Sequence, residues 1–491
     1  MPQIRGRLIV LKSGQKNGTL NPIGWGYEEQ AVDPAELRPL LRGIGSVLGI
    51  REDAYQPPID PGAIELPPPR WTPPTALRDR FDTSPATRLL HAAGRSYRDL
   101  VALRTGQIRH APDAVAQPAN RDELGDLYEL ADRDRLALIP RGGGSSVCGG
   151  VNPEVPDDFN GTIIVDLTRM NRVLDIDVTD RVVHAEAGIL GPDLDAALAP
   201  HGLATRHYPQ SYYHSTLGGW VAARGAGHFS TQYAKIEDRV VQTEMVTPAG
   251  LAWRTRQLPA SSVVVDPNRL AAGSEGMFGI LTEIALRVVS TPTAKAADTW
   301  AFQTFEQALE AGRAIVQAGL WPTQMRILDP FERLVSAMLS GNPAPPEALV
   351  LLSFEGEAQG VVDARAAAAE NLLTAMGGKQ KAKTAAGGEG AAEWKQTFFR
   401  QPYLRDVLID HAVIADTFET AIPWHRAADF YQEVRSAVLD ALNEVCGGGA
   451  VLCRSTHAYP DGVALYFSFY GAGRHGDLID QWWTLKRAAQ E

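Results

Sequence analysis

Short runs of alternating or continuous apolar residues fill the middle of the chain and predict many short strands. Val173–Val178 and Arg181–Ala187 alternate apolar and polar positions on either side of Asp180, which predicts two paired strands joined by a turn. Leu136–Ile139 and Thr162–Leu167 are continuous apolar runs, typical of buried strands. Because helices do not alternate regularly with these strands, the pattern favours an α+β fold over a doubly wound sheet.

Helical spacing of apolar residues is limited to a few segments. The helices that it predicts are Thr87–Leu103, Arg121–Arg133 and Leu190–Pro200. Further predicted strands are Ala114–Ala116, Ile236–Val241, Glu244–Pro248 and Ile284–Val289. These elements begin at about residue 85, where the pattern becomes denser after the proline-rich start of the chain.

Two segments outside this region predict little regular structure. Residues 1 to about 75 are rich in proline and predict an extended arm across the surface, with a short helix near Pro34–Leu48. The segment Gly377–Ala392 is rich in glycine, alanine and lysine and has little to bury, which predicts a mobile loop.

Composition places the chain among ordinary globular proteins. Its 491 residues suggest more than one domain, and 44% hydrophobic with 21% charged residues is typical of soluble proteins. A net charge of −11 argues against nucleic acid as a general partner. The three cysteines form no C-x-x-C pair, so no disulfide framework or zinc site is predicted and a reducing compartment is favoured. No apolar run approaches a membrane span or a signal segment, so we expect a cytoplasmic location.

The most informative stretch is the glycine-rich loop that follows the strand Leu136–Ile139. It contains Gly142, Gly143 and Gly144, followed by the hydroxyls of Ser145 and Ser146. Glycine lets the backbone approach a ligand closely, and successive N–H groups in such a turn bind anions. The loop lacks the Gly-Lys-Ser/Thr ending of a nucleoside-triphosphatase and the spacing of a Rossmann fingerprint. It suits a pyrophosphate, while a plain glycine-rich surface turn is the alternative.

Two more clusters of small residues follow, at Ser215–Gly227 and Gly273–Thr282. Either cluster by itself also fits close packing between helices, and for Ser215–Gly227 that interpretation is favoured. Three clusters, each beside a predicted strand, suit a long, flat dinucleotide that needs backbone access along its length.

The ordered set of four motifs resembles the FAD-binding domain of the vanillyl-alcohol oxidase flavoproteins. The motifs are Pro140–Ser146, Ser215–Gly219, Ile236–Val240 and Gly273–Thr282. Within that superfamily the chain is similar to the alkyldihydroxyacetonephosphate synthases. That likeness rests on Gly24–Tyr27, Arg326–Asp329, Tyr403–Asp406, Phe418–Trp424 and Tyr466–Phe469.

The resemblance implies non-covalently bound FAD and three regions of the chain. These are an N-terminal arm (1–84), a two-subdomain FAD-binding domain of the PCMH type (85–292) and a substrate-binding cap (293–491) with an antiparallel sheet flanked by helices. Candidate cap strands are Thr299–Thr304, Ala348–Phe354, Val413–Ala421 and Val463–Phe469. The implied cofactor residues are Pro140, Arg141, Gly142, Gly143, Gly144, Ser145, Ser146, Gln210, Ser211, Ser215, Thr216, Ala223, Arg224, Gly225, Ala226, Glu275, Gly276, Met277, Phe278, Gly279, Ile280 and Leu281.

The reaction implied is the exchange of the acyl chain of acyl-dihydroxyacetone phosphate for a fatty alcohol, the ether-forming step of ether lipid biosynthesis. In the family, flavin N5 holds the substrate carbon while the acid leaves and the alcohol enters. Tyr466 matches the family's catalytic tyrosine, Arg326 a catalytic position and Arg405 a substrate-binding position. Structural salt bridges for the arginines and strand packing for the tyrosine are the alternatives. For the nearby His457 a core or solvent-facing role is favoured.

The family pattern differs from this sequence at one end. Past the segment that Asp480–Glu491 matches, the family continues into a glycine-rich turn and a run of three active-site histidines. The sequence printed here stops before that run, so it is either a fragment or a protein that works without those histidines.

Three functions therefore stay open at this point. The chain is a synthase of the implied kind, an FAD-dependent oxidoreductase of a 2-hydroxy acid or similar alcohol, or a non-catalytic relative. The expected partner is a small-molecule lipid or hydroxy-acid substrate. Family members often form dimers and contact membranes peripherally, so a homodimer and peripheral membrane contact are also implied.

Overall fold

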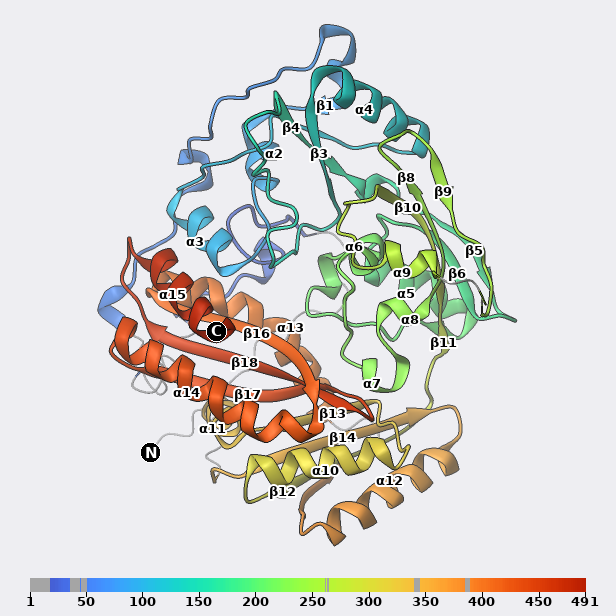
Figure 1. Cartoon of the computed structure of the whole chain (residues 1–491), viewed down its shortest axis with the longest axis vertical. Helices are drawn as coiled ribbons and strands as arrows, with labels where there is room; N and C mark the ends of the chain where they lie inside the picture. The colour runs from blue at the N-terminus through green and yellow to red at the C-terminus, as the bar shows by residue number, and fades with distance from the viewer. Residues whose placement is uncertain are drawn as a thin grey trace.

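The described part of the protein contains two small sheets, a two-stranded pair and one large antiparallel sheet (Figure 1). The computed structural model describes residues 18–35, 45, 51–260, 262, 265–339, 345–384 and 389–491. The large sheet fills the lower half of Figure 1, and the small sheets lie above it. The α+β class and the antiparallel cap sheet with helices are thereby confirmed. Within the described ranges, no helix combines the length and apolar character needed to cross a bilayer.

The first sheet contains three parallel strands. In sheet order its strands are β1 (Phe81–Asp82), β2 (Ala114–Ala116), β4 (Gly161–Asp166) and β3 (Leu136–Arg141). The helices along this part of the chain are α2 (Pro85–Leu90), α3 (Tyr97–Thr105) and α4 (Arg121–Asp134), of which α3 places Tyr97, Leu100 and Val101 in the core of the large sheet. Every residue of β4 is buried, as its continuous apolar run predicts. The Asn120 side chain accepts hydrogen bonds from the N–H groups of Asp122 and Glu123 and so starts α4.

The second sheet is antiparallel and carries the expected hairpin. In sheet order its strands are β5 (Val173–Asp177), β6 (Val182–Glu186), β10 (Ile280–Arg287), β8 (Val240–Val246) and β9 (Ala252–Arg254). Its helices are α5 (Gly191–Leu198), α6 (Leu217–Ala222), α7 (Ser230–Tyr233), α8 (Ile236–Arg239) and α9 (Pro267–Ala271). A short pair, β7 (Leu203–Ala204) with β11 (Val289–Ser290), leads toward the large sheet.

The large sheet has seven antiparallel strands. In sheet order they are β15 (Lys379–Thr384), β12 (Ala294–Phe302), β14 (Ala348–Gly356), β13 (Gln324–Leu328), β17 (Gly449–Ala458), β18 (Gly462–Ala472) and β16 (Val413–Pro423). Its helices are α10 (Phe305–Gln317), α11 (Pro330–Leu339), α12 (Gln359–Ala375), α13 (Glu389–Asp410), α14 (Ala427–Cys446) and α15 (Leu478–Gln490). One large core joins α10, α12, α14 and α15 to the sheet and includes the buried rings of Phe467 and Phe469.

Several local predictions are wrong. Thr87–Leu103 forms two helices rather than one, because Ser96 and Asp99 build a capping box that starts α3 afresh. Ile236–Val241 begins with the short helix α8 before β8. The expected loop Gly377–Ala392 contains β15, which pairs with β12, and the start of α13; residues 385–388 lie outside the described part. The helix predicted near Pro34–Leu48 lies almost wholly outside the described residues.

The N-terminal arm does more than cross the surface, because its Gly24–Tyr27 segment docks on α13. The Trp25 N–H donates to Asp406 (2.8 Å), and the Tyr27 N–H donates to the Tyr403 hydroxyl (3.3 Å). Trp25 and Tyr27 are buried there. The two motifs, 376 or more residues apart, are therefore one packing unit.

Gly26→Ala is expected to lower the free energy of unfolding by about 2–4 kcal/mol. Gly26 has φ +60°, and a Cβ there would lie 2.0 Å from the Tyr403 hydroxyl oxygen. Urea unfolding measures the loss. Gly202→Ala is the matched control, since Gly202 has φ +68° but nothing within 4 Å of its Cβ position, so only the backbone strain of about 1 kcal/mol remains. Equal losses in the two variants would contradict the docking argument.

Candidate functional site

The three glycine-rich segments, far apart in sequence, meet in the structure. A Cβ on Gly143 would lie 1.5 Å from the His214 carbonyl oxygen, and one on Gly142 would lie 2.1 Å from Thr216 Oγ1. A Cβ on Gly276 would lie 2.5 Å from Pro140 Cγ. Glycine is therefore required where these segments touch. The convergence supports the prediction that the three segments line one ligand.

The third segment is also tied to the second by backbone hydrogen bonds. The Glu275 N–H donates to the Ala222 carbonyl (3.1 Å), and the Gly273 N–H donates to the Val221 carbonyl (3.0 Å). Arg224 and Glu275 both have positive φ, at 52° and 47°, so this junction holds two strained backbone positions. Strain of this kind is typical of binding sites.

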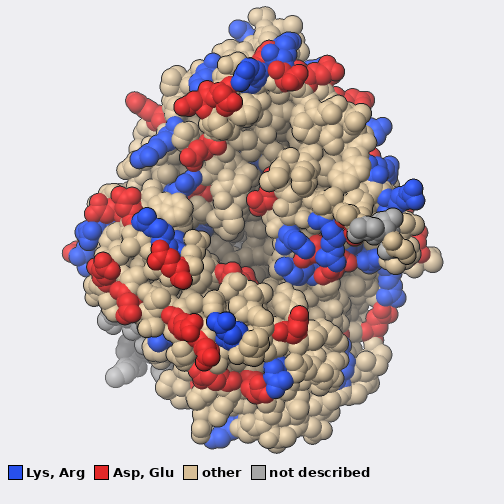
Figure 2. All heavy atoms as spheres, viewed as in Figure 1, with Lys and Arg blue, Asp and Glu red and all other residues tan. Residues whose placement is uncertain are grey.

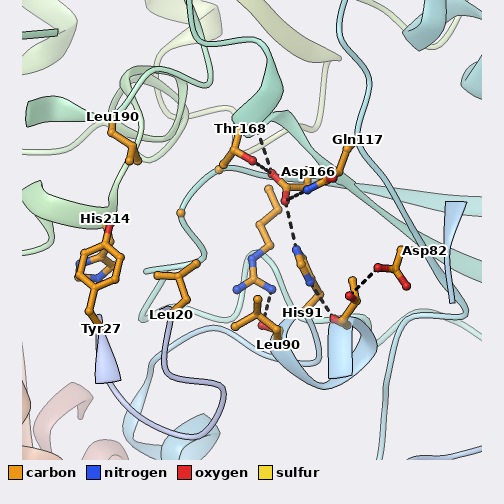
Figure 3. Close-up of a pocket in the computed structure, with 14 residues that line it drawn as sticks. Leu20, Tyr27, Asp82, Leu90, His91, Gln117, Asp166, Thr168, Leu190 and His214 are labelled. Atoms are coloured by element: carbon orange, nitrogen blue, oxygen red, sulfur yellow. Dashed lines mark hydrogen bonds and ion pairs between the residues drawn. The ribbon is translucent and has the colours of Figure 1, made fainter. Parts of the chain in front are cut away.

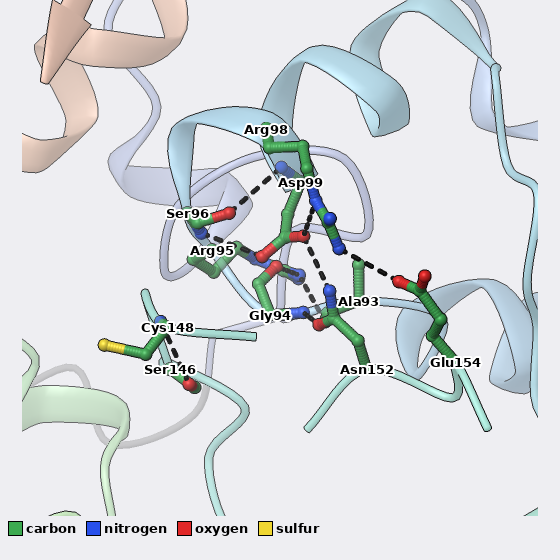
Figure 4. Close-up of polar contacts among 10 residues, drawn as sticks. All are labelled: Ala93, Gly94, Arg95, Ser96, Arg98, Asp99, Ser146, Cys148, Asn152 and Glu154. Carbon is green, nitrogen blue, oxygen red and sulfur yellow. Dashed lines mark hydrogen bonds and ion pairs between the residues drawn. The ribbon is translucent and has the colours of Figure 1, made fainter. Parts of the chain in front are cut away.

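The glycine loop leaves the carboxyl end of β3 and is held from the other side by the start of α3. The Arg95 N–H donates to the Ser146 carbonyl (2.7 Å). The Gly94 N–H donates to Asn152 Oδ1 (2.8 Å), and Asn152 Nδ2 donates to Asp99 Oδ1 (2.8 Å) (Figure 4). This network holds the loop at Ser146 and Asn152, so this part of its backbone is organised before any ligand binds.

A cavity of about 410 Å³ adjoins the loop at the carboxyl ends of the parallel strands (Figure 3). Arg141, which is 4% exposed as a residue, lines the cavity, and its guanidinium donates to the Leu90 carbonyl (2.9 Å). Burial, and then the neighbouring charge of Arg95, lower the pKa of Arg141 to about 9, so it stays a cation at neutral pH. Asp166, in the same cavity, is already bound by His91 (3.3 Å), Gln117 (2.9 Å) and Thr168 (2.9 Å).

These residues fit the pyrophosphate of FAD. A buried cation whose nearest acceptor is a neutral carbonyl favours an anionic ligand. His214 adds two ring nitrogens that are buried without hydrogen-bond partners among the described residues, and it lines the same cavity. Burial lowers the pKa of His214 to about 3, so its ring is neutral and offers one donor and one acceptor.

The remaining predicted cofactor residues take different places. The Gln210 side chain reaches α13 and donates to the Phe398 carbonyl (3.0 Å), while Ser215 Oγ accepts from Trp220 Nε1 (2.7 Å). Met277 and Phe278 are 78% and 46% exposed, as expected of apolar residues that a ligand would cover. Ile280 and Leu281 open β10 with buried side chains and would therefore offer only backbone groups. The predicted positions Ala223, Gly225 and Ala226 lie in the second segment, Ser215–Gly227, and Ser211 lies shortly before it.

The candidate catalytic residues lie two strands apart in the large sheet, Arg326 on β13 and Tyr466 on β18, with β17 between them. The Arg454 guanidinium carbon lies 4.6 Å from the centre of the Tyr466 ring, across the β17–β18 pair. Arg326 on β13 donates from Nη1 to the Thr456 carbonyl on β17 (2.9 Å). On the other side of Tyr466, its cross-strand neighbour Glu419 on β16 bonds to the Thr456 hydroxyl. Arg326, Arg454, Glu419 and Tyr466 thus form one polar cluster.

The electrostatics of this cluster favour a neutral phenol beside a cation. Burial raises the pKa of Tyr466, and the opposing charge of Arg454 only partly offsets it, so the phenol keeps its proton at neutral pH. Burial and Arg454 lower the pKa of Arg326 to about 10. A protonated tyrosine beside a buried guanidinium can bind an anion and supply a proton next to it.

Arg405, on α13, contacts residues outside this cluster. Its Nη2 donates to the Arg95 carbonyl (2.6 Å), and its Nη1 lies 3.9 Å from Asp416. Its guanidinium also packs 5.6 Å from the Trp25 ring centre. The substrate-binding role of Arg405 stays a prediction, since these contacts equally suit a group that holds the start of α3 against the large sheet.

Arg454, Glu419 and His228 were missed by sequence reasoning, which considered only His457 nearby. His457 is 8% exposed, and burial, Arg326 and Lys235 lower its pKa to about 3. The available signal for Arg454 was the continuous polar run Arg454–His457, which directly follows the apolar run Val451–Cys453 within one strand. His228 had no such signal.

The buried carboxyl of Asp329, which directly follows β13, should make the free energy of unfolding depend on pH. Burial raises its pKa to about 7, while Tyr431, Cys453 and Glu332 donate hydrogen bonds to it. The unfolded value is about 3.9, so only the folded state holds this proton between these pH values, and stability falls as pH rises through that window. Asp329→Asn should remove a fall of up to about 3 kcal/mol between pH 5 and pH 8, measured by urea unfolding at these two pH values. Identical pH slopes in both proteins would contradict this assignment.

This face of the protein is hollowed at its centre, above the large sheet (Figure 2). Basic and acidic side chains gather at the rim of the hollow. A recess here is compatible with access from solvent to the junction between the small sheets and the large one.

Comparison with known proteins covers almost the whole chain. Residues 112–256 match the family model of the FAD binding domain, and residues 291–484 match that of the C-terminal domain of FAD linked oxidases. The alkyldihydroxyacetonephosphate synthase of Trypanosoma brucei brucei is 31% identical over 436 residues, which are 84% of this chain and 70% of that protein. The one from Dictyostelium discoideum is 31% identical over 80% of this chain and 66% of that protein.

Solved structures agree with these relatives. An alkyldihydroxyacetonephosphate synthase structure superposes with a TM-score of 0.81 at 27% identity, covering 96% of this chain and 92% of the other. A substrate-bound p-cresol methylhydroxylase shares the fold, with a TM-score of 0.64 at 11% identity over 84% and 83% of the two chains.

Proposed function

Because the chain belongs to the alkyldihydroxyacetonephosphate synthase family of FAD-linked oxidases, we propose that it exchanges the acyl chain of an acyl-dihydroxyacetone phosphate for a fatty alcohol. The observation that carries the proposal is the cluster of Arg326, Arg454 and Tyr466 on adjacent strands. This cluster places a fixed cation and a protonated phenol together, which an anionic ester substrate requires.

FAD would be held by the glycine loop Gly142–Ser146 and by the segment around Thr216, and it would supply an electrophilic ring nitrogen. One C–O bond, to the leaving fatty acid, breaks, and one C–O bond, to the entering alcohol, forms. The electrons balance without an external oxidant or reductant. The residues of the chain would bind and orient the substrate and transfer protons.

Arg326 is proposed to bind the anionic group of the substrate through its planar guanidinium, since paired N–H donors match phosphate oxygens. Tyr466 is proposed to donate its phenolic proton toward the leaving carboxylate and to take a proton from the entering alcohol. The raised pKa of Tyr466 fits this order, because the group starts the cycle protonated. The positive charge of Arg454 would limit the rise in the pKa of Tyr466, because it stabilises the phenolate when the phenolate forms.

The test is an exchange assay with palmitoyl-dihydroxyacetone phosphate and hexadecanol on the FAD-loaded protein. Mass spectrometry should find one palmitate released for each hexadecyl ether formed, with no flavin bleaching that persists. A 28% identical relative over 57% of this chain is named glycolate oxidase subunit GlcD, so D-lactate and glycolate are the competing substrates. Flavin bleaching by either acid, without ether formation, would replace the proposal with a 2-hydroxy-acid oxidoreductase.

A further inference from the structure

One contact joins the FAD-binding part to the candidate catalytic arginine. His228 lies between α6 and α7, and its Nδ1 is 3.0 Å from Nη2 of Arg326 on β13. The two residues are 8% and 4% exposed. The contact therefore lies in a region from which water is largely removed, where a hydrogen bond to a charged group contributes more than on the surface.

The chemistry of the two groups fixes the direction of this bond. A guanidinium has only donors, so Nδ1 of His228 accepts and the imidazole is neutral, with its proton on Nε2. Arg326 also donates from Nη1 to the Thr456 carbonyl (2.9 Å). Two acceptors on two separate segments define the plane of the guanidinium, which one acceptor alone would leave free to rotate.

His228 is itself held in place. Its N–H donates to the Tyr208 carbonyl (3.0 Å), just before the predicted flavin segment Gln210–Thr216. Its ring packs 4.9 Å from the ring of Phe229 and 4.9 Å from that of Phe398 on α13. The orientation of the imidazole is therefore set by both the FAD-binding part and the cap.

We propose that His228 is a positioning residue that aims the Arg326 guanidinium at the anionic group of the substrate. The inference rests on the proposed role of Arg326 as the anion-binding residue, and it holds for a phosphate or a carboxylate. His228 thereby connects the proposed cofactor and substrate sites. The Tyr208 carbonyl, just before the predicted flavin segment, holds the backbone of His228, and the His228 ring accepts from Arg326.

Two substitutions separate positioning from packing. His228→Asn keeps an acceptor, because Asn Oδ1 takes nearly the place of Nδ1, but it loses ring volume. His228→Leu keeps most of the volume but removes the acceptor. If His228 only fills space, Asn is the more harmful change; if it positions Arg326, Leu is the more harmful one.

The measurement is isothermal titration of FAD-loaded protein with dihydroxyacetone phosphate and, separately, with glycolate. We expect the wild type to bind at least one probe, Arg326→Met to weaken it at least about 10-fold, His228→Leu about 5- to 10-fold and His228→Asn about 2-fold or less. FAD content and Tm are recorded for each variant. In the His228→Leu protein both should stay near wild type while affinity falls.

Four results would overturn the inference. They are a wild type that binds neither probe, an Arg326→Met variant that binds normally, a His228→Leu variant that binds normally, and a His228→Asn variant as weak as His228→Leu. The exchange assay tests the proposed synthase function separately from these binding measurements. If the variants bind glycolate in the expected order of affinity but the wild type exchanges no acyl chain, the inference about His228 stands and the proposed synthase reaction is wrong.

Discussion

Gly143→Ala is expected to raise the dissociation constant of FAD at least about 100-fold, a loss of about 2.7 kcal/mol. The new Cβ would lie 1.5 Å from the His214 carbonyl oxygen, 2.6 Å from its carbonyl carbon and 3.1 Å from Ser215 Cα. All three are backbone atoms, so no rotamer change relieves the clash. The loop must move away from the His214–Thr216 segment, and the two halves of the cavity separate.

Gly150→Ala is the matched control in the same loop. Its Cβ would lie 3.4 Å from the end of the Glu275 side chain, an ordinary contact that a flexible carboxylate can adjust. Flavin fluorescence titration of the refolded apoproteins gives both dissociation constants, and circular dichroism verifies that each variant is folded. A folded Gly143→Ala protein that holds FAD as tightly as the control would show that contact between the two segments is not needed for binding.

Tyr466→Phe is expected to lower kcat of the exchange reaction by about 10²–10³-fold with little change in KM or FAD content. The substitution removes the phenolic proton but keeps the ring under the Arg454 guanidinium, so packing on β18 should be retained. The loss therefore appears in the proton-transfer steps. Steady-state assays with palmitoyl-dihydroxyacetone phosphate and hexadecanol measure it.

Tyr470→Phe controls for the loss of a phenol from the same strand. Tyr470 is four residues further along β18, so it lies on the same face of the strand, and burial raises its pKa as well. We expect its kcat to stay within about 3-fold of the wild type. Equal losses in the two variants, or full activity in Tyr466→Phe, would remove Tyr466 from the proton-transfer role.

The sequence by itself determined the α+β class, most strands and the glycine-rich segments. The strands β2, β4, β5 and β6 were predicted because the alternation or continuity of apolar residues in a strand is visible over a few consecutive positions. The resemblance to a family of flavoproteins came from the ordered motifs, and the comparisons confirm the family. The prediction failed where a local feature was ambiguous, as in the small-residue segment that supplies β15 and the start of α13.

Only the tertiary structure decided which distant residues meet. Nothing local indicates that Gly143 must touch His214, that Trp25 binds Asp406, or that His228 accepts from Arg326. Such partners are chosen by the packing of whole elements, whereas periodicity and glycine content act over a few residues. The sequence therefore supplies the chemical groups of the site, and the packing of the small sheets against the large one sets their distances, burial and charge.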